Sequence, residues 1–253
     1  MKKIAIYTSI VGNIDSLMEP HIIHDQCDYI CFVEKGKTVN YKKGVWQFRE
    51  IPYANKDNRV LSRFVKINPH LVLAEYDYSL WIDGNVTISD YKFYEILWDK
   101  IDKEIDYSGV CHWGRDCSYE EAYAILNANK DSVKRIVRSL LFLKRNNFPK
   151  HYGMYENNVI FRKHNKQNII EFDTLWWYLY LKYSHRDQVL HSYCLYKMGI
   201  CFDYLLPPEY CARNHYSLYY KKHENNDCSI NYSNLLIRKF KVWFSKIILG
   251  FLN

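Results

Sequence analysis

The tripeptide Asp83-Gly84-Asn85 has the residue types of a metal and phosphate site. It directly follows residues 79–82, an apolar run that reads as a β-strand, so we expect its side chains at a strand end rather than in the core. Gly84 allows a close backbone turn, and Asp83 and Asn85 offer a carboxylate and an amide oxygen to a cation such as Mg²⁺ or Mn²⁺. A plain turn between a strand and a helix explains the same residues, so both interpretations stay open.

A second candidate group consists of three cations, Arg59, Arg63 and Lys66. They recur at i, i+4 and i+7 within residues 55–68, a charged segment predicted to be a helix that ends before Pro69. This spacing puts the three side chains on one helical face. They would then either bind a diphosphate or form an ordinary solvated face.

Three polar residues, His112, Arg115 and Asp116, follow a predicted strand over residues 107–112. The planar guanidinium of Arg115 suits a phosphate or a sugar carboxylate, and we expect His112 to contact a sugar acceptor. A structural Arg-Asp pair at the start of a helix is the alternative explanation for Arg115 and Asp116.

Two carboxylates, Asp187 and Glu156, are the candidate catalytic bases. An inverting sugar transferase uses one carboxylate to deprotonate the acceptor hydroxyl, whereas a retaining one need not. Asp187 lies between Arg186 and Gln188, which we expect to contact the acceptor. Asp187 is equally explained as an acid at a helix N-terminus.

The periodicity of apolar residues predicts the elements that must position these side chains. Strands are predicted over residues 3–10, 28–34, 45–51, 79–82, 107–112, 158–162 and 200–206. Helices are predicted over residues 55–68, 91–104, 118–126, 131–146, 166–183 and 186–198, with N-terminal caps from Asp90, from Ser118 paired with Glu121, and from Asp131. Strands and helices in alternation, followed by a mixed second half, indicate a three-layer α/β domain. Ligands of such sheets bind beyond the carboxyl ends of the strands, where Asp83 is expected.

The composition is that of a folded globular domain, with 48% hydrophobic and 25% charged residues in 253 residues. Aromatic residues make up 17%, which suits stacking on sugars or bases but also fits a biased base composition. The net charge of +7 is compatible with nucleic acid, anionic lipid or a phosphorylated substrate. No RNA-binding motif or zinc-finger spacing supports the nucleic acid.

Eight cysteines are scattered through the chain without a CxxC pair. The first residues run straight into a strand pattern and lack the apolar region of a signal peptide. We therefore expect reduced thiols and a cytoplasmic protein.

The C-terminal segment, residues 231–253, is predicted to form a basic amphipathic helix. Its cations share one side of a helical wheel, and large apolar side chains including Trp243 occupy the other. This pattern favours a helix lying in an anionic membrane interface at the inner face of the cell membrane. A helix packed on its own domain or on a twin subunit is the alternative. Residues 1–230 are expected to form the main domain.

Several blocks of sequence occur together in one order. They are Tyr7-Thr8-Ser9-Ile10-Val11-Gly12-Asn13-Ile14-Asp15, Cys31-Phe32-Val33, Asn68-Pro69-His70, Tyr76-Asp77-Tyr78-Ser79-Leu80-Trp81-Ile82-Asp83-Gly84-Asn85, His112-Trp113-Gly114-Arg115-Asp116-Cys117-Ser118-Tyr119-Glu120-Glu121-Ala122, Tyr155-Glu156-Asn157-Asn158-Val159-Ile160-Phe161-Arg162 and Arg186-Asp187-Gln188. This ordered set, over about residues 4–200, resembles the glycosyltransferase-like domain shared by plant Golgi pectin (rhamnogalacturonan) galacturonosyltransferases and bacterial surface-polysaccharide proteins.

The resemblance implies a GT-A-type fold, in which a Rossmann-like nucleotide-binding half is continuous with an acceptor-binding half. It also implies a nucleotide-sugar donor, with a UDP-sugar expected, and a divalent metal. Such folds usually carry Asp-x-Asp where this chain has Asp-Gly-Asn. One fewer charge weakens metal binding, so the transferase interpretation is firmer than its metal dependence.

The resemblance also assigns expected roles to individual residues. The loop after the first strand is placed at the nucleotide, and a plain Gly-Asn turn is the alternative explanation for it. Asp83 is expected to contact both donor and metal, and His215 to be a third metal ligand beside Asn85. An ordinary surface histidine is the alternative for His215. The expected donor-binding residues are Thr8, Gly12, Asn13, Asp15, Arg59, Arg63, Lys66, Asp83, Gly84, Arg115 and Asp116.

The function expected from these observations is hexosyl or uronosyl transfer from a nucleotide sugar to a lipid-linked or growing surface glycan, such as capsule or O-antigen lipopolysaccharide. The alternative is a non-catalytic carbohydrate-binding or scaffold protein that keeps the fold, which the missing second Asp allows. Nucleic-acid binding is a third hypothesis, which rests on charge and aromatic content alone.

Overall fold

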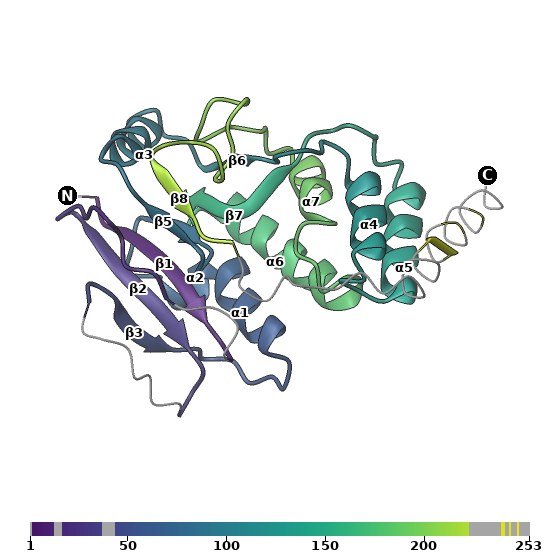
Figure 1. Ribbon diagram of the computed structural model, residues 1–253, viewed down its shortest axis with the longest axis horizontal. Helices are drawn as coiled ribbons and strands as arrows, with labels where there is room; N and C mark the ends of the chain where they lie inside the picture. The colour runs from purple at the N-terminus through teal and green to yellow at the C-terminus, as the bar shows by residue number, and fades with distance from the viewer. Residues whose placement is uncertain are drawn as a thin grey trace.

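The protein is represented by a computed structural model that describes residues 2–12, 17–36 and 44–222, together with residues 239, 240, 243 and 247. Its main sheet has six strands in the order β3-β2-β1-β4-β7-β6, and a small second sheet pairs β5 with β8 (Figure 1). The strands are β1 (Ile4–Ile10), β2 (Cys27–Val33), β3 (Gln47–Glu50), β4 (Tyr78–Ile82), β5 (Val86–Ile88), β6 (Tyr107–Cys111), β7 (Tyr155–Arg162) and β8 (Leu218–Tyr220).

The main sheet is mixed, and the directions of its strands decide where the functional residues meet. Strands β3, β2, β1 and β4 run parallel, whereas β7 is antiparallel to both β4 and β6. The carboxyl ends of β4 and β6 therefore meet the amino end of β7 at one edge of the sheet. This is the edge at which parallel α/β sheets bind ligands.

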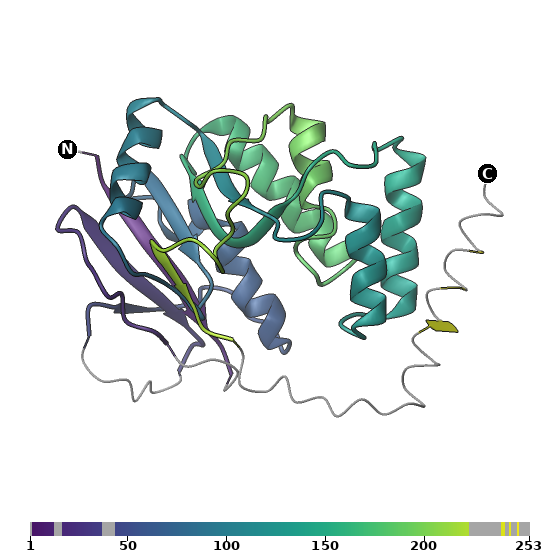
Figure 2. The ribbon, with the colours of Figure 1, turned by 45° about the horizontal axis from the view of Figure 1, so that its top comes forward.

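Helices cover both faces of the sheet. They are α1 (Asn58–Ile67), α2 (Pro69–Val72), α3 (Lys92–Asp102), α4 (Ser118–Asn127), α5 (Val133–Arg145), α6 (Gln167–Lys182) and α7 (His191–Met198). Side chains alternate along β4, so Tyr78, Leu80 and Ile82 pack with α3 and the small sheet, while Trp81 packs with the core under α1, α6 and α7. Helices α4 and α5 stand side by side at the end of the molecule away from β2 and β3 (Figures 1 and 2). The expected three-layer α/β architecture is confirmed.

Two predicted elements differ from the structure. The helix predicted over residues 186–198 begins only at His191, because contacts from other elements hold Asp187 in a turn: its carbonyl accepts the Trp176 Nε1–H at 2.9 Å. Residues 200–206 do not form a strand, since their backbone pairing with the sheet is confined to Gly109, whose N–H and carbonyl bond to Asp203 and Leu205. The last strand is instead β8, which sequence periodicity did not indicate.

Two predicted helix caps also differ. Cys117, not Ser118, is the N-cap of α4, and the Glu121 carboxylate turns away from the helix end to bond the Arg115 Nε–H at 2.6 Å. In α5 the cap is Ser132, whose hydroxyl accepts the Arg135 N–H. Asp131 instead accepts the Ser184 hydroxyl at 2.7 Å, which ties the start of α5 to the segment before α7.

The remaining expectations concern membrane segments and thiols. No helix in the described ranges is long and apolar enough to span a bilayer. The cysteines in the described part of the chain, which excludes Cys228, are all unpaired. Most of the predicted C-terminal helix, residues 231–253, lies outside the described residues.

Candidate active site

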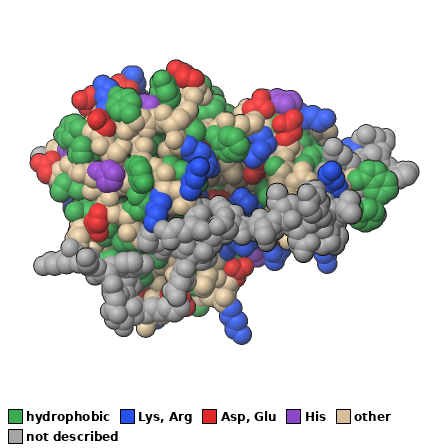
Figure 3. All heavy atoms as spheres, viewed as in Figure 1, with side chains coloured by type: hydrophobic (Ala, Val, Ile, Leu, Met, Phe, Trp, Pro, Cys, Tyr) green, Lys and Arg blue, Asp and Glu red, His purple; other side chains and the backbone are tan. Residues whose placement is uncertain are grey.

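A cleft of about 620 Å³ opens at the sheet edge where β4 and β6 end and β7 begins. Backbone hydrogen bonds fix this edge: the Asp83 N–H donates to the Asn158 carbonyl at 2.8 Å, and the His112 N–H donates to the Met154 carbonyl at 3.0 Å. Because β7 runs antiparallel, its first residues, including Glu156, lie beside Asp83 and His112. Figure 3 shows Lys and Arg side chains gathered around a hollow in the middle of the face drawn there.

The cleft brings together most of the residues that the sequence singled out, although they come from five separate parts of the chain. They are Arg59, Arg63, Lys66, Asp83, Gly84, Asn85, His112, Arg115, Glu156, Arg186, Asp187 and Gln188. The helical spacing of the three α1 cations does place them on one face, and that face lines the cleft.

Four of the residues expected to bind the donor or a metal do not line the cleft: Thr8, Gly12, Asp116 and His215. Thr8 is buried within β1, and His215 is buried with its Nδ1 sharing a hydrogen bond of 2.7 Å with the Ser217 hydroxyl, so neither lines the cleft. Asp116 is exposed and bonds His151 outside the cleft.

The loop after β1 is described only in part, since Asn13 and Asp15 lie outside the described residues. Gly12 itself does not line the cleft, but it has a positive φ of 69°, and a Cβ there would meet Asn58 Nδ2 at 2.7 Å. Glycine therefore permits the end of β1 to pass close to the start of α1, where Val11 and Asn58 both line the cleft.

A network of ion pairs forms the floor of the cleft. The Lys66 ammonium lies 2.7 Å from Asp187 Oδ2 and 3.2 Å from Asp83 Oδ1, and Arg63 Nε lies 3.3 Å from Asp187 Oδ2. Asp83 Oδ1 also accepts the Trp81 Nε1–H at 2.7 Å. Burial alone would raise the pKa of Asp187, but Arg63 and Lys66 outweigh it and hold that pKa well below its usual range. Asp187 is thus held as an anion that positions two cations.

The pKa of the other candidate base, Glu156, is shifted in the opposite direction to that of Asp187. Its side chain is 7% exposed and forms an ion pair with Arg213. Burial raises the pKa of Glu156, and the neighbouring Arg213 only partly opposes this. A carboxylate with a raised pKa is a stronger base than one with a depressed pKa, so Glu156 is better suited than Asp187 to accept a proton.

His112 is held as a neutral side chain at the end of β6. Burial lowers the pKa of His112 to about 4, and Arg115 and Arg213 add to this. Its Nδ1 accepts the N–H groups of Gly114 at 3.2 Å and Arg115 at 2.8 Å, so the proton belongs on Nε2. His112 thereby fixes the turn that aims Arg115 and Trp113 at the cleft.

The cleft has a surplus of positive charge. Its lining cations are Arg59, Arg63, Lys66, Arg115, Lys130, Arg186 and Arg213, and its carboxylates are Asp83, Glu121, Glu156 and Asp187. Each carboxylate is paired with a cation of this set. Within the described part of the chain, Arg59, Lys130 and Arg186 have no carboxylate within ion-pair distance. A cleft with three such cations is built for an anion.

Neutral groups in the cleft suit a hydroxyl-rich ligand. Glu156 Oε2, Asn157 Oδ1 and Asn158 Oδ1 are buried without a hydrogen-bond partner among the described residues. Burying an oxygen atom without a hydrogen bond costs free energy, and the hydroxyl groups of a bound sugar would supply the missing hydrogen-bond donors. Trp113 is 59% exposed at the cleft, with the guanidinium groups of Arg115 and Arg213 each 5.8 Å from its ring centroid.

Sequence reasoning assigned no ligand-binding or catalytic role to several of the residues that line the cleft. They are Trp113, Glu121, Lys130, Asn157, Asn158 and Arg213. Trp113 and the two Asn residues had a usable signal, because they lie next to His112 and Glu156. Arg213 and Lys130 had none, since they reach the cleft from segments with no local pattern.

The residues expected to hold a metal do not assemble as a metal site. His215 lies outside the cleft lining, and Asn85 donates its Nδ2–H to the Lys221 carbonyl at 2.9 Å. The remaining ligand, Asp83, is paired with Lys66. The donor set beside the cleft therefore does not fit the divalent cation that the resemblance implied.

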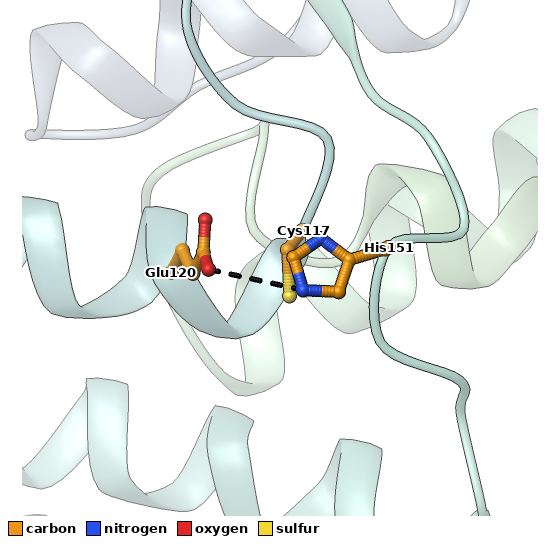
Figure 4. Close-up of side chains that lie close together, drawn as sticks. All are labelled: Cys117, Glu120 and His151. Atoms are coloured by element: carbon orange, nitrogen blue, oxygen red, sulfur yellow. Dashed lines mark ion pairs between the residues drawn. The ribbon is translucent and has the colours of Figure 1, made fainter.

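A different group of potential metal ligands lies outside the cleft. One ligand atom from each of Cys117, Glu120 and His151 falls within 4.8 Å of the others (Figure 4). Cys117 is buried, while the other two are exposed, and His151 Nδ1 lies 2.7 Å from Asp116 Oδ1. The contacts of the expected donor-binding residue Asp116 thus belong to this surface cluster.

The family model TOD1/MUCI70, glycosyltransferase-like domain, matches residues 1–215. Among solved structures, mouse xyloside xylosyltransferase 1 in its apo form is similar with a TM-score of 0.45 and 9% sequence identity, over 91% of this chain and 99% of that chain. No curated protein sequence matches the chain. Because one family model covers residues 1–215 of the 253, the chain belongs to the TOD1/MUCI70 glycosyltransferase-like domain family.

Proposed function

We propose that the chain is a glycosyltransferase that moves a sugar from a nucleotide-diphosphate donor, a UDP-sugar in the first instance, to a glycan acceptor. The observation that carries this proposal is the surplus of cations in the cleft, where Arg59, Lys130 and Arg186 have no carboxylate partner among the described residues. A diphosphate supplies the missing negative charge, and a family of glycosyltransferase-like domains supplies the reaction class.

The donor diphosphate is placed at α1. Arg59, Arg63 and Lys66 line the cleft from one helical face. Arg186, which the sequence assigned to the acceptor, is proposed to bind the diphosphate instead, because it lies within electrostatic reach of Arg63 and Arg59. Arginine binds phosphate oxygens through two parallel hydrogen bonds, which fixes the diphosphate as well as attracting it. Gly84 also lines the cleft.

The acceptor is placed around Trp113 and the first residues of β7, which also line the cleft. An exposed indole at a cleft provides an apolar face on which a sugar ring stacks. The unpaired oxygens of Asn157 and Asn158 accept hydrogen bonds from hydroxyl groups. His112 and Gln188 also line the cleft, and they are proposed to contact the acceptor.

Glu156 is the proposed base. It lies in the same cleft as the α1 cations, and burial raises its pKa above the ordinary value. Asp187, the other candidate from the sequence, is proposed to act by holding Lys66 and Arg63 instead.

The wider setting is proposed to be surface-polysaccharide synthesis at the inner face of the cell membrane. Support comes from two described tail residues, Phe240 and Trp243, which are 59% and 57% exposed with ring centroids 5.6 Å apart. Adjacent exposed aromatic rings suit a membrane interface.

Deletion of residues 234–253 should release the protein from anionic vesicles while leaving nucleotide binding intact. Sedimentation of the truncated form with vesicles would remove this idea.

Nucleotide sugars are the direct test of the central proposal. A panel of UDP-, GDP- and CMP-sugars should contain at least one that raises the melting temperature, because a ligand that binds only the folded state stabilises it. The same donor should be hydrolysed slowly or transferred to a glycan. Binding without hydrolysis or transfer would identify the non-catalytic carbohydrate-binding alternative, and no binding at all would refute both.

A further inference from the structure

We propose that Lys66 takes the place of a divalent metal, so that this chain binds and releases its nucleoside diphosphate without one. The inference rests on the proposed function and deepens it by naming the group that stabilises the leaving diphosphate. The resemblance implied a divalent metal at Asp83, but the fold brings a lysine ammonium to this carboxylate instead.

Two groups of the protein already contact Asp83 Oδ1, a carboxylate oxygen that a metal at Asp83 would use. Asp83 Oδ1 lies 3.2 Å from the Lys66 ammonium and accepts the Trp81 Nε1–H at 2.7 Å. A divalent cation at this carboxylate would face the lysine charge across a distance of a few ångströms, in a site where Lys66 is 1% exposed and poorly screened. The chain also provides an amide, Asn85, where a second carboxylate would offset that repulsion.

Contacts to the side chain and to the backbone of Lys66 fix its ammonium group in position. Its ammonium lies 2.7 Å from Asp187 Oδ2 and 5.4 Å from the ring centroid of Trp81. Its backbone carbonyl accepts hydrogen bonds from the Tyr7 hydroxyl at 3.2 Å and from Arg162, which is itself fully buried. A cation fixed in this way stabilises developing negative charge without reorganising during the reaction.

The local charge count agrees with a metal-free diphosphate site. Four cations, Arg59, Arg63, Lys66 and Arg186, line this wall with two carboxylates, Asp83 and Asp187. The surplus of two positive charges matches the doubly charged diphosphate of a nucleotide sugar. A metal would add two further charges that neither the protein nor this ligand offsets.

The transfer step balances with these residues alone. The bond between the anomeric carbon and the diphosphate oxygen breaks, and its electron pair stays on that oxygen. The acceptor hydroxyl oxygen forms the new bond to the carbon and gives up its proton to the proposed base. Lys66, with Arg63 beside it, offsets the charge that develops on the leaving oxygen.

Titration calorimetry of the full-length chain with UDP and GDP tests the inference. Each titration is run in EDTA and again with excess Mn²⁺. We expect one of the two nucleotides to bind with dissociation constants that agree within about threefold in EDTA and in Mn²⁺, since the charged hydrogen bonds come from the protein. Lys66→Met should weaken binding in EDTA by roughly tenfold or more, and Lys66→Arg should retain most of it.

The matched control is Lys100→Met, because Lys100 is also largely buried, pairs with Asp203 at 2.6 Å and does not line the cleft. It should bind as the wild type does. Binding that requires Mn²⁺ in the wild-type chain overturns the inference and leaves the proposed function standing, whether or not Lys66→Met folds. Unchanged binding by a folded Lys66→Met also overturns it. Failure of every nucleotide and nucleotide sugar under both conditions refutes the proposed function, and the inference with it.

Discussion

The Lys66 ammonium lies 2.7 Å from the Asp187 carboxylate, so an ion pair joins α1 to the turn before α7 at the floor of the cleft. The two residues are 1% and 9% exposed, which places the pair away from solvent screening. Their separation in sequence is large, yet the cleft depends on both.

Asp187→Asn should unfold more easily and bind nucleotide more weakly. Removing one partner of a buried ion pair leaves the other charge uncompensated, which typically costs about 3 kcal/mol. Urea denaturation measures the free energy of unfolding, and calorimetry measures nucleotide affinity. The control is Asp203→Asn, whose partner Lys100 lies outside the cleft. Equal stability of Asp187→Asn and wild type would contradict a central role for the pair.

The same pair predicts a dependence of stability on pH. The pKa of Asp187 is lowered in the folded protein, so its contribution is fully present above the pKa of the unfolded chain, near the ordinary value of 3.8, and is lost as the pH falls toward the folded pKa. Below about pH 4 the wild type should therefore lose its stability advantage over Asp187→Asn. Urea midpoints of both proteins between neutral and acidic pH measure this convergence.

Glu156→Gln should lose most of its transferase activity and keep its affinity for the donor. General-base catalysis contributes roughly 10²–10⁴-fold, so turnover should drop by at least about a hundredfold. Because burial raises the pKa of Glu156, wild-type activity should fall on acidification at a pH above 4.5, as the carboxylate gains its proton. Glu156→Gln should lack that limb of the pH–rate profile. A variant with near-normal turnover would show that another group accepts the proton.

Trp113→Ala should raise the KM for the acceptor with little change in the affinity for the nucleotide. The loss of one stacked ring corresponds to roughly 1 kcal/mol, or about a fivefold change. Trp113→Phe should recover much of it, since a ring remains. Tyr178→Ala is the control, because Tyr178 is 52% exposed but does not line the cleft. Steady-state kinetics with the acceptor varied at saturating donor make the comparison.

Arg186→Gln should weaken nucleotide binding by roughly tenfold, because it removes a charged donor with no carboxylate partner in the described structure. The affinity of this variant should also depend less on salt, since one fewer charge attracts the ligand. Arg138→Gln is the control: Arg138 packs over Tyr183, with its guanidinium 5.5 Å from the ring centroid, and does not line the cleft. Calorimetry at two salt concentrations distinguishes the variants.

Local pattern in the sequence indicated much of the scaffold. The β-branched run of β1 and the apolar run before Asp83 both form buried strands, because a strand inside a covered sheet needs apolar side chains on both faces. The i, i+4, i+7 spacing of the α1 cations placed them on one face without any tertiary information. The departures occur where distant contacts override local preference, as in the late start of α7 and the pairing of Glu121 with Arg115.

The sequence by itself determined the α/β layers and the polar side chains at the ends of strands, because each depends on residue types that are close together in the chain. It also determined the family, because the order of short sequence blocks along the chain is readable without the fold. The tertiary structure alone decided the partner of each charge. It joined Lys66 to Asp187 and to Asp83, it paired Glu156 with Arg213, and it left His215 outside the cleft. An ion pair or a pKa depends on distances across the fold and on burial, and neither quantity is encoded in the spacing of residues along the chain.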